Sequence, residues 1–436
     1  MSRSQKPCIF VLTLVIFLCV PSIVSADAVT DWNAIAQQTI ASQGTVHPGA
    51  TAILDSAMVQ AAVYDAVESI TGQFRPYAVH VPGASGSTTA AVAKAAHDVL
   101  VNRFPSLTAS LDMTYHDYLA ANKLSESDPG VAVGAQAAAG IIALRSNDGS
   151  FPSPPPPPFT GGTAPGEWRP TTSYLPGPPP SNSPMLAPWL ATVTPFTIKS
   201  PSQFRPVAPP GLTTQRYATE YNEVKAIGAR FNSARTTGQT NMALFFNMNF
   251  FVVYNQALRD IANAHLSSID DSARLFALVN LSMADAVITA WDSKRHFVFW
   301  RPVTAIQEGE NDGNPGSIGD PDWQPFINTP NYPTYTSGAN NVTGALTRSL
   351  ALFFGSDEMS FTLHTTNATA PVQTRDYNRF SDLAQDVVDV RIFQGIHFRF
   401  DDVQARKQGR HVAQWVFSHF LRSVDADDHD DHDDGE

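Results

Sequence analysis

The apolar residues of this chain recur mainly at helical spacing. In residues 50–70, ATAILDSAMVQAAVYDAVESI, apolar side chains return every three or four positions, and the same pattern continues through residues 272–294. The alanine-rich runs AVAKAAHDVL and AVGAQAAAGIIAL also favour helix, because alanine has the highest helix propensity. Alternating patterns typical of strands are scarce. We therefore predict an all-α protein with a helical-bundle architecture.

A proline-rich segment divides the helical pattern into two halves. Residues 151–212 contain SPPPPPF and PGPPPSNSP, through which a helix cannot continue. Trp168, Trp189 and Phe196 are interspersed there, so we expect a long connection that packs over the surface rather than a disordered linker. The predicted organisation is an N-terminal helical half (27–150), this connection, and a C-terminal helical half (213–422). In the second half, residues 219–231 and 237–266 also have helical patterns.

The two ends of the chain differ from the helical body. Residues 1–26 have basic Arg3 and Lys6, the apolar run IFVLTLVIFLCV and the small residues VSA, which predict a cleaved signal peptide and a secreted or periplasmic protein. The apolar run is short for a membrane span, so we expect no stable span in the mature chain. Cys8 and Cys19 both lie in this segment, which excludes thiolate chemistry and cysteine-bound metals from the mature protein.

The charge balance is acidic. The formal net charge is −12, and removal of the two basic residues in the signal leaves about −14. Much of it lies in the tail, residues 423–436, where eight acids alternate with His429 and His432. We interpret this tail as a solvated extension, with a divalent-metal site as the alternative. Nucleic-acid binding needs a basic face, and the sequence predicts none.

Three short stretches of the C-terminal half combine cations, a hydroxyl, a glycine amide and an imidazole. They read AWDSKRHFVFWRPV, PNYPTYTSGANN and VRIFQGIHFRFDD. Each has an ordinary explanation alone: cations at the edge of an amphipathic helix, a serine N-cap, and a packed histidine beside a carboxylate. Together they can enclose a tetrahedral oxyanion. The candidate residues are Lys294, Arg301, Ser337, Gly338, Arg391, His397 and Asp401.

Local spacing predicts how these residues are presented. Lys294 and Arg301 are seven apart, so we expect them on one face of one helix that Pro302 ends. Ser337 and Gly338 precede a helical pattern, and a helix start offers amides to an anion. His397 follows a glycine that interrupts a helix, which would place it at a helix start, where the dipole opposes protonation. A neutral imidazole is what a nucleophile or metal ligand requires.

In combination, the stretches resemble the signature of the vanadium-dependent haloperoxidase and type 2 phosphatidic acid phosphatase superfamily. That signature is Lys-x6-Arg-Pro, then Pro-Ser-Gly-His, then Ser-Arg-x5-His-x3-Asp. The first element is complete here, and the third has Val390 where serine is usual. The flanks FWRP and RIFQGIHFRFD are more similar to vanadium chloroperoxidases than to the membrane phosphatases. DWNAIA, AAVYDAVESI and PGEWRP are similar to secreted bacterial members.

The resemblance implies a vanadate cofactor and a role for each candidate. Lys294, Arg301 and Arg391 would bind equatorial oxygens of vanadate or phosphate, and Ser337 with the Gly338 amide would complete the cradle. His397 would be the axial vanadium ligand or the phosphatase nucleophile, and Asp401 would orient it. Trp291 and Tyr332 correspond to aromatic groups near the halide.

The middle stretch departs from the signature. Thr336 replaces proline, and Ala339 stands where the signature has the histidine that acts as general acid–base. Asn340, the next residue, can hydrogen-bond but does not titrate. General acid–base help typically contributes about 10²–10⁴-fold, so this loss would reduce catalysis strongly.

Three functions follow as hypotheses. The first is a secreted vanadium haloperoxidase-like enzyme that oxidises halide with hydrogen peroxide, impaired by Ala339. The second is a soluble acid phosphatase with His397 as nucleophile. The third is a non-catalytic oxyanion-binding protein. All three imply small-molecule partners.

Overall fold

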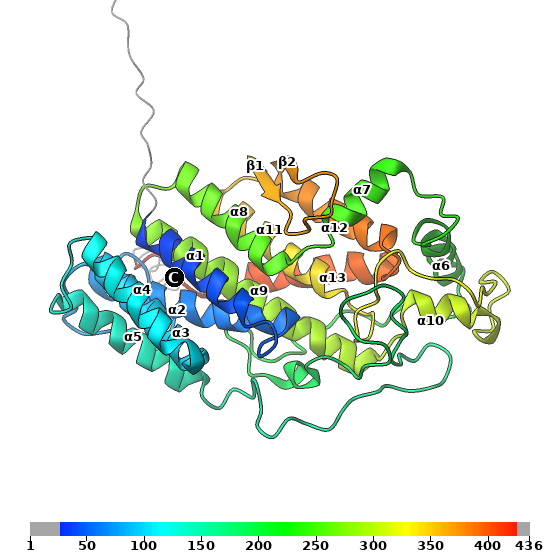
Figure 1. The fold of residues 1–436 in the computed structure, drawn as a ribbon, viewed down its shortest axis with the longest axis horizontal. Coiled ribbons are helices and arrows are strands. Elements are labelled where there is room, and N and C mark those ends of the chain that lie inside the picture. The colour runs from blue at the N-terminus through cyan, green and yellow to red at the C-terminus, as the bar shows by residue number, and fades with distance from the viewer. Residues whose placement is uncertain (1–26, 425–436) are drawn as a thin grey trace, which may run out of the picture.

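The structure, a computed structural model, describes residues 27–424; the predicted signal peptide and residues 425–436 of the predicted tail lie outside the described residues. Within residues 27–424, thirteen α-helices and one two-stranded sheet form the fold (Figure 1), which confirms the all-α prediction. Short 3₁₀ turns occur at Gly49–Thr51, Pro105–Leu107, Pro188–Thr192 and Gly309–Asn311.

The N-terminal helices pack against one another at one end of the molecule. They are α1 (Ala28–Ser42), α2 (Ala52–Thr71), α3 (Thr88–Arg103), α4 (Thr108–Ala121) and α5 (Pro129–Arg145). The alanines of α3 are buried, as are most residues of α2. Small side chains let these helices approach closely, which explains the alanine-rich runs of the sequence.

Helix α9 (Ile269–Phe297) runs through the middle of the molecule and contacts both groups of helices (Figure 1). It packs on α2 on one side and on α11 (Gly338–Phe354) and α13 (Arg399–His419) on the other. Within the described residues it is the one helix long and apolar enough to cross a membrane, and 94% of its apolar window is buried inside the protein. Its hydrophobicity therefore belongs to the core.

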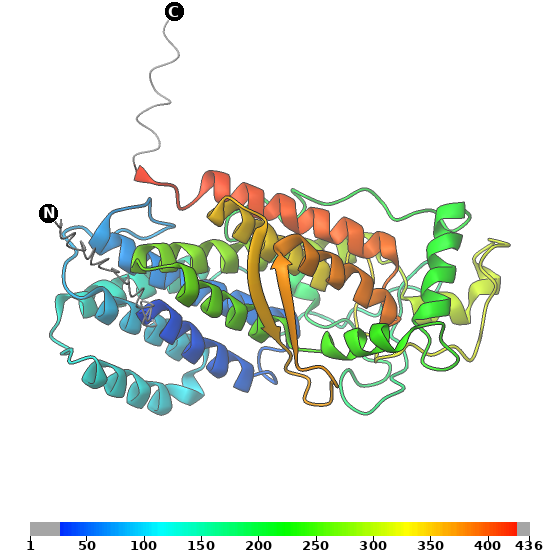
Figure 2. The ribbon, with the colours of Figure 1, turned by 90° about the horizontal axis from the view of Figure 1, so that it is seen from above.

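The remaining elements of the C-terminal half surround α9, α11 and α13. They are α6 (Gln215–Ile227), α7 (Thr237–Phe245), α8 (Phe250–His265), α10 (Pro302–Gln307) and α12 (Phe380–Phe393), with the strands β1 (Glu358–His364) and β2 (Thr374–Arg379). Figure 2 shows α11, α12 and α13 side by side along one face. A Cβ on Gly344 of α11 would lie 2.4 Å from the Arg406 oxygen of α13, so this close approach requires glycine.

Two local features differ from the sequence pattern. An antiparallel hairpin, β1–β2, covers α8 and α12, with Phe361 opposite Tyr377. The helical pattern of residues 237–266 is broken between α7 and α8, where Asn249 caps α8 and the Thr365 hydroxyl binds the Phe245 carbonyl. Tertiary hydrogen bonds therefore override the helical propensity of this segment.

The proline-rich connection packs along the helices; Figure 1 shows it as the teal loop along one edge. Trp168 is fully buried and Phe196 is 7% exposed. Asp285 of α9 anchors the connection: its carboxylate accepts hydrogen bonds from the amides of Phe196, Thr197 and Ile198 at 2.7–3.0 Å. Burial raises the pKa of Asp285, and these bonds oppose the shift.

We expect Asp285→Asn to lower the free energy of unfolding by about 2 kcal/mol, because the nitrogen of the new amide group would face buried N–H donors and cannot accept a hydrogen bond from them. Denaturant unfolding measures the change. Asp292→Asn is a matched control on the same helix, where Asp292 pairs with Arg205, 30% exposed, at 2.7 Å. That variant should lose less than about 1 kcal/mol. Equal losses would contradict the assigned anchor.

Candidate active site

The predicted site residues lie at the ends of separate elements that converge between α9, α11, α12 and α13. Lys294 is in the last turn of α9 and Ser337 is the N-cap of α11. Arg391 is in the last turn of α12, and His397 lies two residues before α13. Helix ends expose backbone groups and side chains together, which suits binding of a small charged group.

The prediction that Lys294 and Arg301 share one helix is wrong. Helix α9 ends at Phe297, and Val298 has a left-handed conformation with φ 50°. Arg301 is instead the N-cap of α10, with Pro302 at the first helical position, where its missing N–H costs nothing. Proline therefore starts the second helix here, after the chain has already left the first.

The segment between these helices is fixed by the proline-rich connection. The Trp168 amide donates to the Val298 carbonyl at 2.7 Å, and the Trp300 amide donates to the Gly166 carbonyl at 2.9 Å. The PGEWRP stretch therefore forms a short bridge with the chain that carries Arg301, which holds this arginine against the other site residues.

All three cations are buried. Lys294 and Arg301 are 0% exposed and Arg391 is 8% exposed. Lys294 Nζ donates to the carbonyls of Pro333 and Thr334 at 2.7 and 3.1 Å. These partners are neutral, so they satisfy donors without compensating the charge.

Each arginine also keeps an unused donor. Arg301 Nη2 and Arg391 Nε have no hydrogen-bond partner among residues 27–424. Burial lowers the pKa of Lys294 well below its usual range, with Arg301 as the next cause, and lowers the pKa of Arg301 to about 10. Buried cations with spare donors favour an anionic ligand, because it would supply both the missing charge and the missing acceptors.

His397 is held in one neutral tautomer. Its Nε2 lies 3.0 Å from Arg301 Nη1, which can only donate, so Nε2 is the acceptor. Its Nδ1 then carries the proton, 3.2 Å from Asp401 Oδ2 and 3.0 Å from the Thr334 hydroxyl. Burial lowers the pKa of His397 well below its usual range, and the charges of Arg301, Lys294 and Arg391 lower it further. The imidazole therefore presents a lone pair among the cations.

Asp401 connects His397 to its surroundings. Besides the imidazole, its Oδ2 accepts from the Thr334 hydroxyl at 2.5 Å and from the Phe398 amide at 3.1 Å. Gly395, with φ 77°, makes the turn that brings the chain from α12 into this position. Asp401 therefore lies beside the imidazole, and its orienting role stays a prediction.

The start of α11 provides the remaining predicted groups. Ser337 and Gly338 are buried, and the Ser337 side chain makes no capping bond; its hydroxyl oxygen lies 3.4 Å from Asn340 Nδ2. Ala339, where the signature has histidine, is partly exposed and has no polar side-chain atom. Asn340 turns inward, and its Nδ2 donates to Asp402 Oδ1 at 2.8 Å.

The two predicted aromatic residues border the same cluster. The rings of Trp291 and Tyr332 are 4.9 Å apart, and Lys294 Nζ lies 4.8 Å from the centre of the Tyr332 ring. The Trp291 ring also packs on Gly338, where an added Cβ would lie 3.3 Å from it. Tyr332 is partly exposed, so this side faces the solvent approach.

Three residues of the cluster were missed from the sequence. Thr334 binds both His397 and Asp401, Gln394 Oε1 accepts from Arg391 Nη1 at 2.6 Å, and Asp402 contacts Asn340. Thr334 lies in an irregular loop with no periodic signal. Asp402 is adjacent to Asp401, and this pair of acidic residues is the one sequence feature that could have indicated Asp402 as a site residue.

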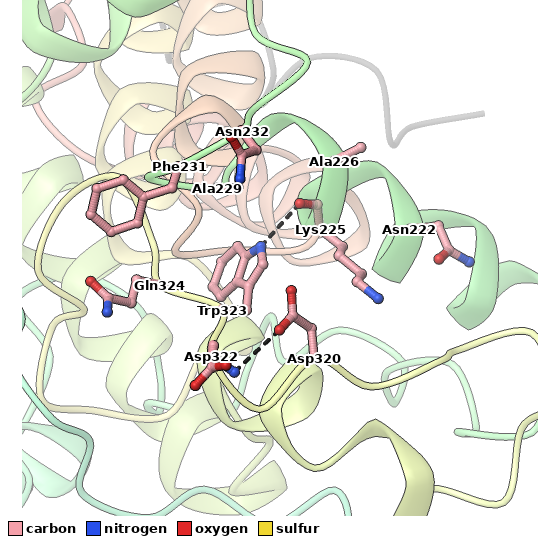
Figure 3. Close-up of a pocket in the computed structure, with 10 residues that line it drawn as sticks. All are labelled: Asn222, Lys225, Ala226, Ala229, Phe231, Asn232, Asp320, Asp322, Trp323 and Gln324. Atoms are coloured by element: carbon pink, nitrogen blue, oxygen red, sulfur yellow. Dashed lines mark hydrogen bonds between the residues drawn. The ribbon is translucent and has the colours of Figure 1, made fainter.

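A surface cavity lies elsewhere on the molecule. It has a volume of about 670 Å³ and is lined by residues of α6 and the 320–324 loop (Figure 3). Its central Trp323 is fixed by a 3.0 Å bond from Nε1 to the Lys225 carbonyl. None of the predicted site residues lines this cavity, so it is separate from the candidate active site.

Comparison with known proteins finds similarity in the part of the chain that contains the candidate site. Residues 274–426 match the family model described as the VCPO second helical-bundle domain. A relative, the vanadium chloroperoxidase of Curvularia inaequalis, is 28% identical over 45% of this chain and 43% of its own. The match thus spans less than half of the relative's length.

Solved structures share the fold over most of the chain. A bacterial vanadium-dependent iodoperoxidase matches with a TM-score of 0.74 and 23% identity, covering 91% of this chain and 98% of that protein. The holo form of a bacterial vanadium-dependent chloroperoxidase matches with a TM-score of 0.67 and 16% identity, covering 91% and 93%. These likenesses show that the chain shares the fold of these structures, and the family model matches the part of the chain that contains the candidate site.

Proposed function

We propose that this protein is a secreted vanadium haloperoxidase-like enzyme, which binds vanadate and uses hydrogen peroxide to oxidise halide. One observation carries the proposal. The neutral His397 Nε2 lies among three buried cations, two of which keep donors with no partner in the described part of the chain. The proposed export follows from the signal peptide that residues 1–26 predict.

The donor set fits vanadate. A tetrahedral oxyanion accepts hydrogen bonds at every oxygen, and Arg301 Nη2, Arg391 Nε and the Ser337 hydroxyl would serve them. His397 Nε2 would supply the nitrogen ligand. When bound, vanadate would supply the activation of hydrogen peroxide that halide oxidation requires.

The protein's own groups prepare this binding. Asp401 and Thr334 hold the His397 proton on Nδ1, which keeps Nε2 available. Because Arg301 Nη1 contacts Nε2 here, binding at Nε2 requires that guanidinium to turn toward the anion. Lys294, Arg301 and Arg391 would then compensate the anionic charge in a site with little water, where such interactions are strong.

The proposal predicts the following result. The mature protein, freed of metal with chelator, should oxidise bromide or iodide only after vanadate is added, in proportion to bound vanadium. His397→Ala should lose the bound vanadium and the activity, because the nitrogen ligand is gone. Vanadium content after dialysis and halide oxidation with peroxide are the measurements.

Other outcomes select the alternatives. Hydrolysis of p-nitrophenyl phosphate that vanadate inhibits would identify a phosphatase with His397 as nucleophile and would overturn the haloperoxidase proposal. Neither activity, together with a rise in melting temperature on adding the anion, would indicate a non-catalytic binder.

A further inference from the structure

The substitution at Ala339 leaves the oxyanion cradle without its usual proton-transfer group. Ala339 has no titratable atom, and Asn340 does not titrate. His397 Nδ1 is bonded to Asp401 and Thr334, and its Nε2 faces the anion position. The site therefore needs another group to hold and deliver a proton.

Asp402 lies where such a group would be useful. It is on the first turn of α13, 0% exposed, against the start of α11. Its Oδ1 accepts from Asn340 Nδ2 at 2.8 Å, and the same Nδ2 lies 3.4 Å from the Ser337 hydroxyl oxygen. Its Oδ2 is buried and has no hydrogen-bond partner among residues 27–424. Asp402 thus contacts Asn340 directly and lies beside the Ser337 hydroxyl at the start of α11.

The surroundings of Asp402 favour its neutral form. Burial raises its pKa well above the usual range, and the charge of Asp401 raises it further; the Ser337 hydroxyl, Arg391 and Asn340 lower it in part. No group in the described chain donates a hydrogen bond to Oδ2, so no hydrogen bond at this atom compensates a negative charge on it; protonation would remove that charge. Other charged groups that face Asp402 are Lys294 of α9, Arg301 at the start of α10 and Arg406 of α13.

We propose that Asp402 takes the place of the missing histidine as the proton-holding group of this site, acting through the Ser337 hydroxyl. The proposal rests on the anion-binding function given above. The O–H bond of the protonated Asp402 carboxyl group would break as its proton moves to Ser337 Oγ, while the Ser337 proton moves to an oxygen of the bound anion. The negative charge passes from the anion to the Asp402 carboxylate, so atoms and charge balance. Asp402 is therefore a positioning residue, because it acts on the anion through Ser337.

Sulfate is a suitable probe because it is fully ionised between pH 5 and 9 and does not itself titrate. Infrared difference spectra of the wild type against Asp402→Asn should contain the carbonyl-stretch band of a protonated carboxylic acid. This band should disappear as the pH rises, and it should persist to higher pH with sulfate bound, since a nearby anion raises the pKa of a carboxyl group. Asp382→Asn, an exposed change on α12, is the control and should keep the band.

Two results would overturn the proposal. One is the absence of any Asp402-dependent band down to pH 5, which would mean a permanent carboxylate. The other is a band whose pH dependence is the same with and without sulfate, as expected of a carboxyl group too far from the anion to exchange a proton with it. If sulfate does not raise the melting temperature of the wild type at all, the anion cradle itself fails, and this proposal fails with it. That result is distinct from binding without proton coupling.

Discussion

Replacement of Arg391 with alanine is expected to remove most of the stabilisation that phosphate or vanadate gives to this protein. The wild type, with the anion at 100 times its dissociation constant, should gain about 2.7 kcal/mol. Arg391 provides a buried, charge-assisted donor with no competing partner at Nε in the described chain. Loss of such a bond costs about 1.5–3 kcal/mol, so affinity should fall roughly 100-fold and the gain at the same concentration to about 0.4 kcal/mol.

The measurement is the difference in melting temperature with and without the anion, for each variant separately. This difference is independent of how the substitution changes the stability of the anion-free protein. Arg410→Ala is the matched control, because Arg410 is an exposed arginine on α13. It should keep the full wild-type gain. If Arg391→Ala keeps it too, the anion does not bind among these cations.

The sequence predicts the third stretch well because its geometry is local. Arg391, His397 and Asp401 are linked by one tight turn, and the glycine needed at that turn, Gly395, is visible in the sequence. A spacing of four at the start of α13 places Asp401 beside His397 whatever the rest of the fold does. Such short-range relations survive without knowledge of the tertiary structure.

The first stretch shows where spacing fails. Lys294 and Arg301 are two helical turns apart in sequence, yet the chain reverses at Val298 and begins a new helix at Pro302. That reversal depends on hydrogen bonds to Gly166 and Trp168, 130 or more residues earlier in the chain. Both arginine and lysine still reach the cluster, because tertiary contacts with the proline-rich connection replace the expected helix.

Asp402 could not be assigned to the site from the sequence for a related reason. Asp401 and Asp402 are neighbours on one helix and point to different partners, His397 and Asn340. Which carboxylate meets which side chain depends on the packing of α11 against α13, where Gly344 allows the backbones to approach. The sequence contains the two acids, but the division of their roles is tertiary.

The second large effect is expected on kcat: Asp402→Asn should lower it, and Ala339→His should restore much of it in the same protein. If Asp402 supplies the proton, Asp402→Asn should lower kcat for halide oxidation by about 10²-fold, within the range of general acid–base contributions, with little change in vanadate affinity. A histidine at position 339 would lie at a partly exposed point of the first turn of α11. It should restore much of the lost rate in the Asp402→Asn protein and change the wild-type rate far less, because two groups with one task are not additive. The four proteins form a double-mutant cycle in kcat. An equal increase in both backgrounds would mean that the wild-type site has no proton carrier at all, and that Asp402 has only a structural part.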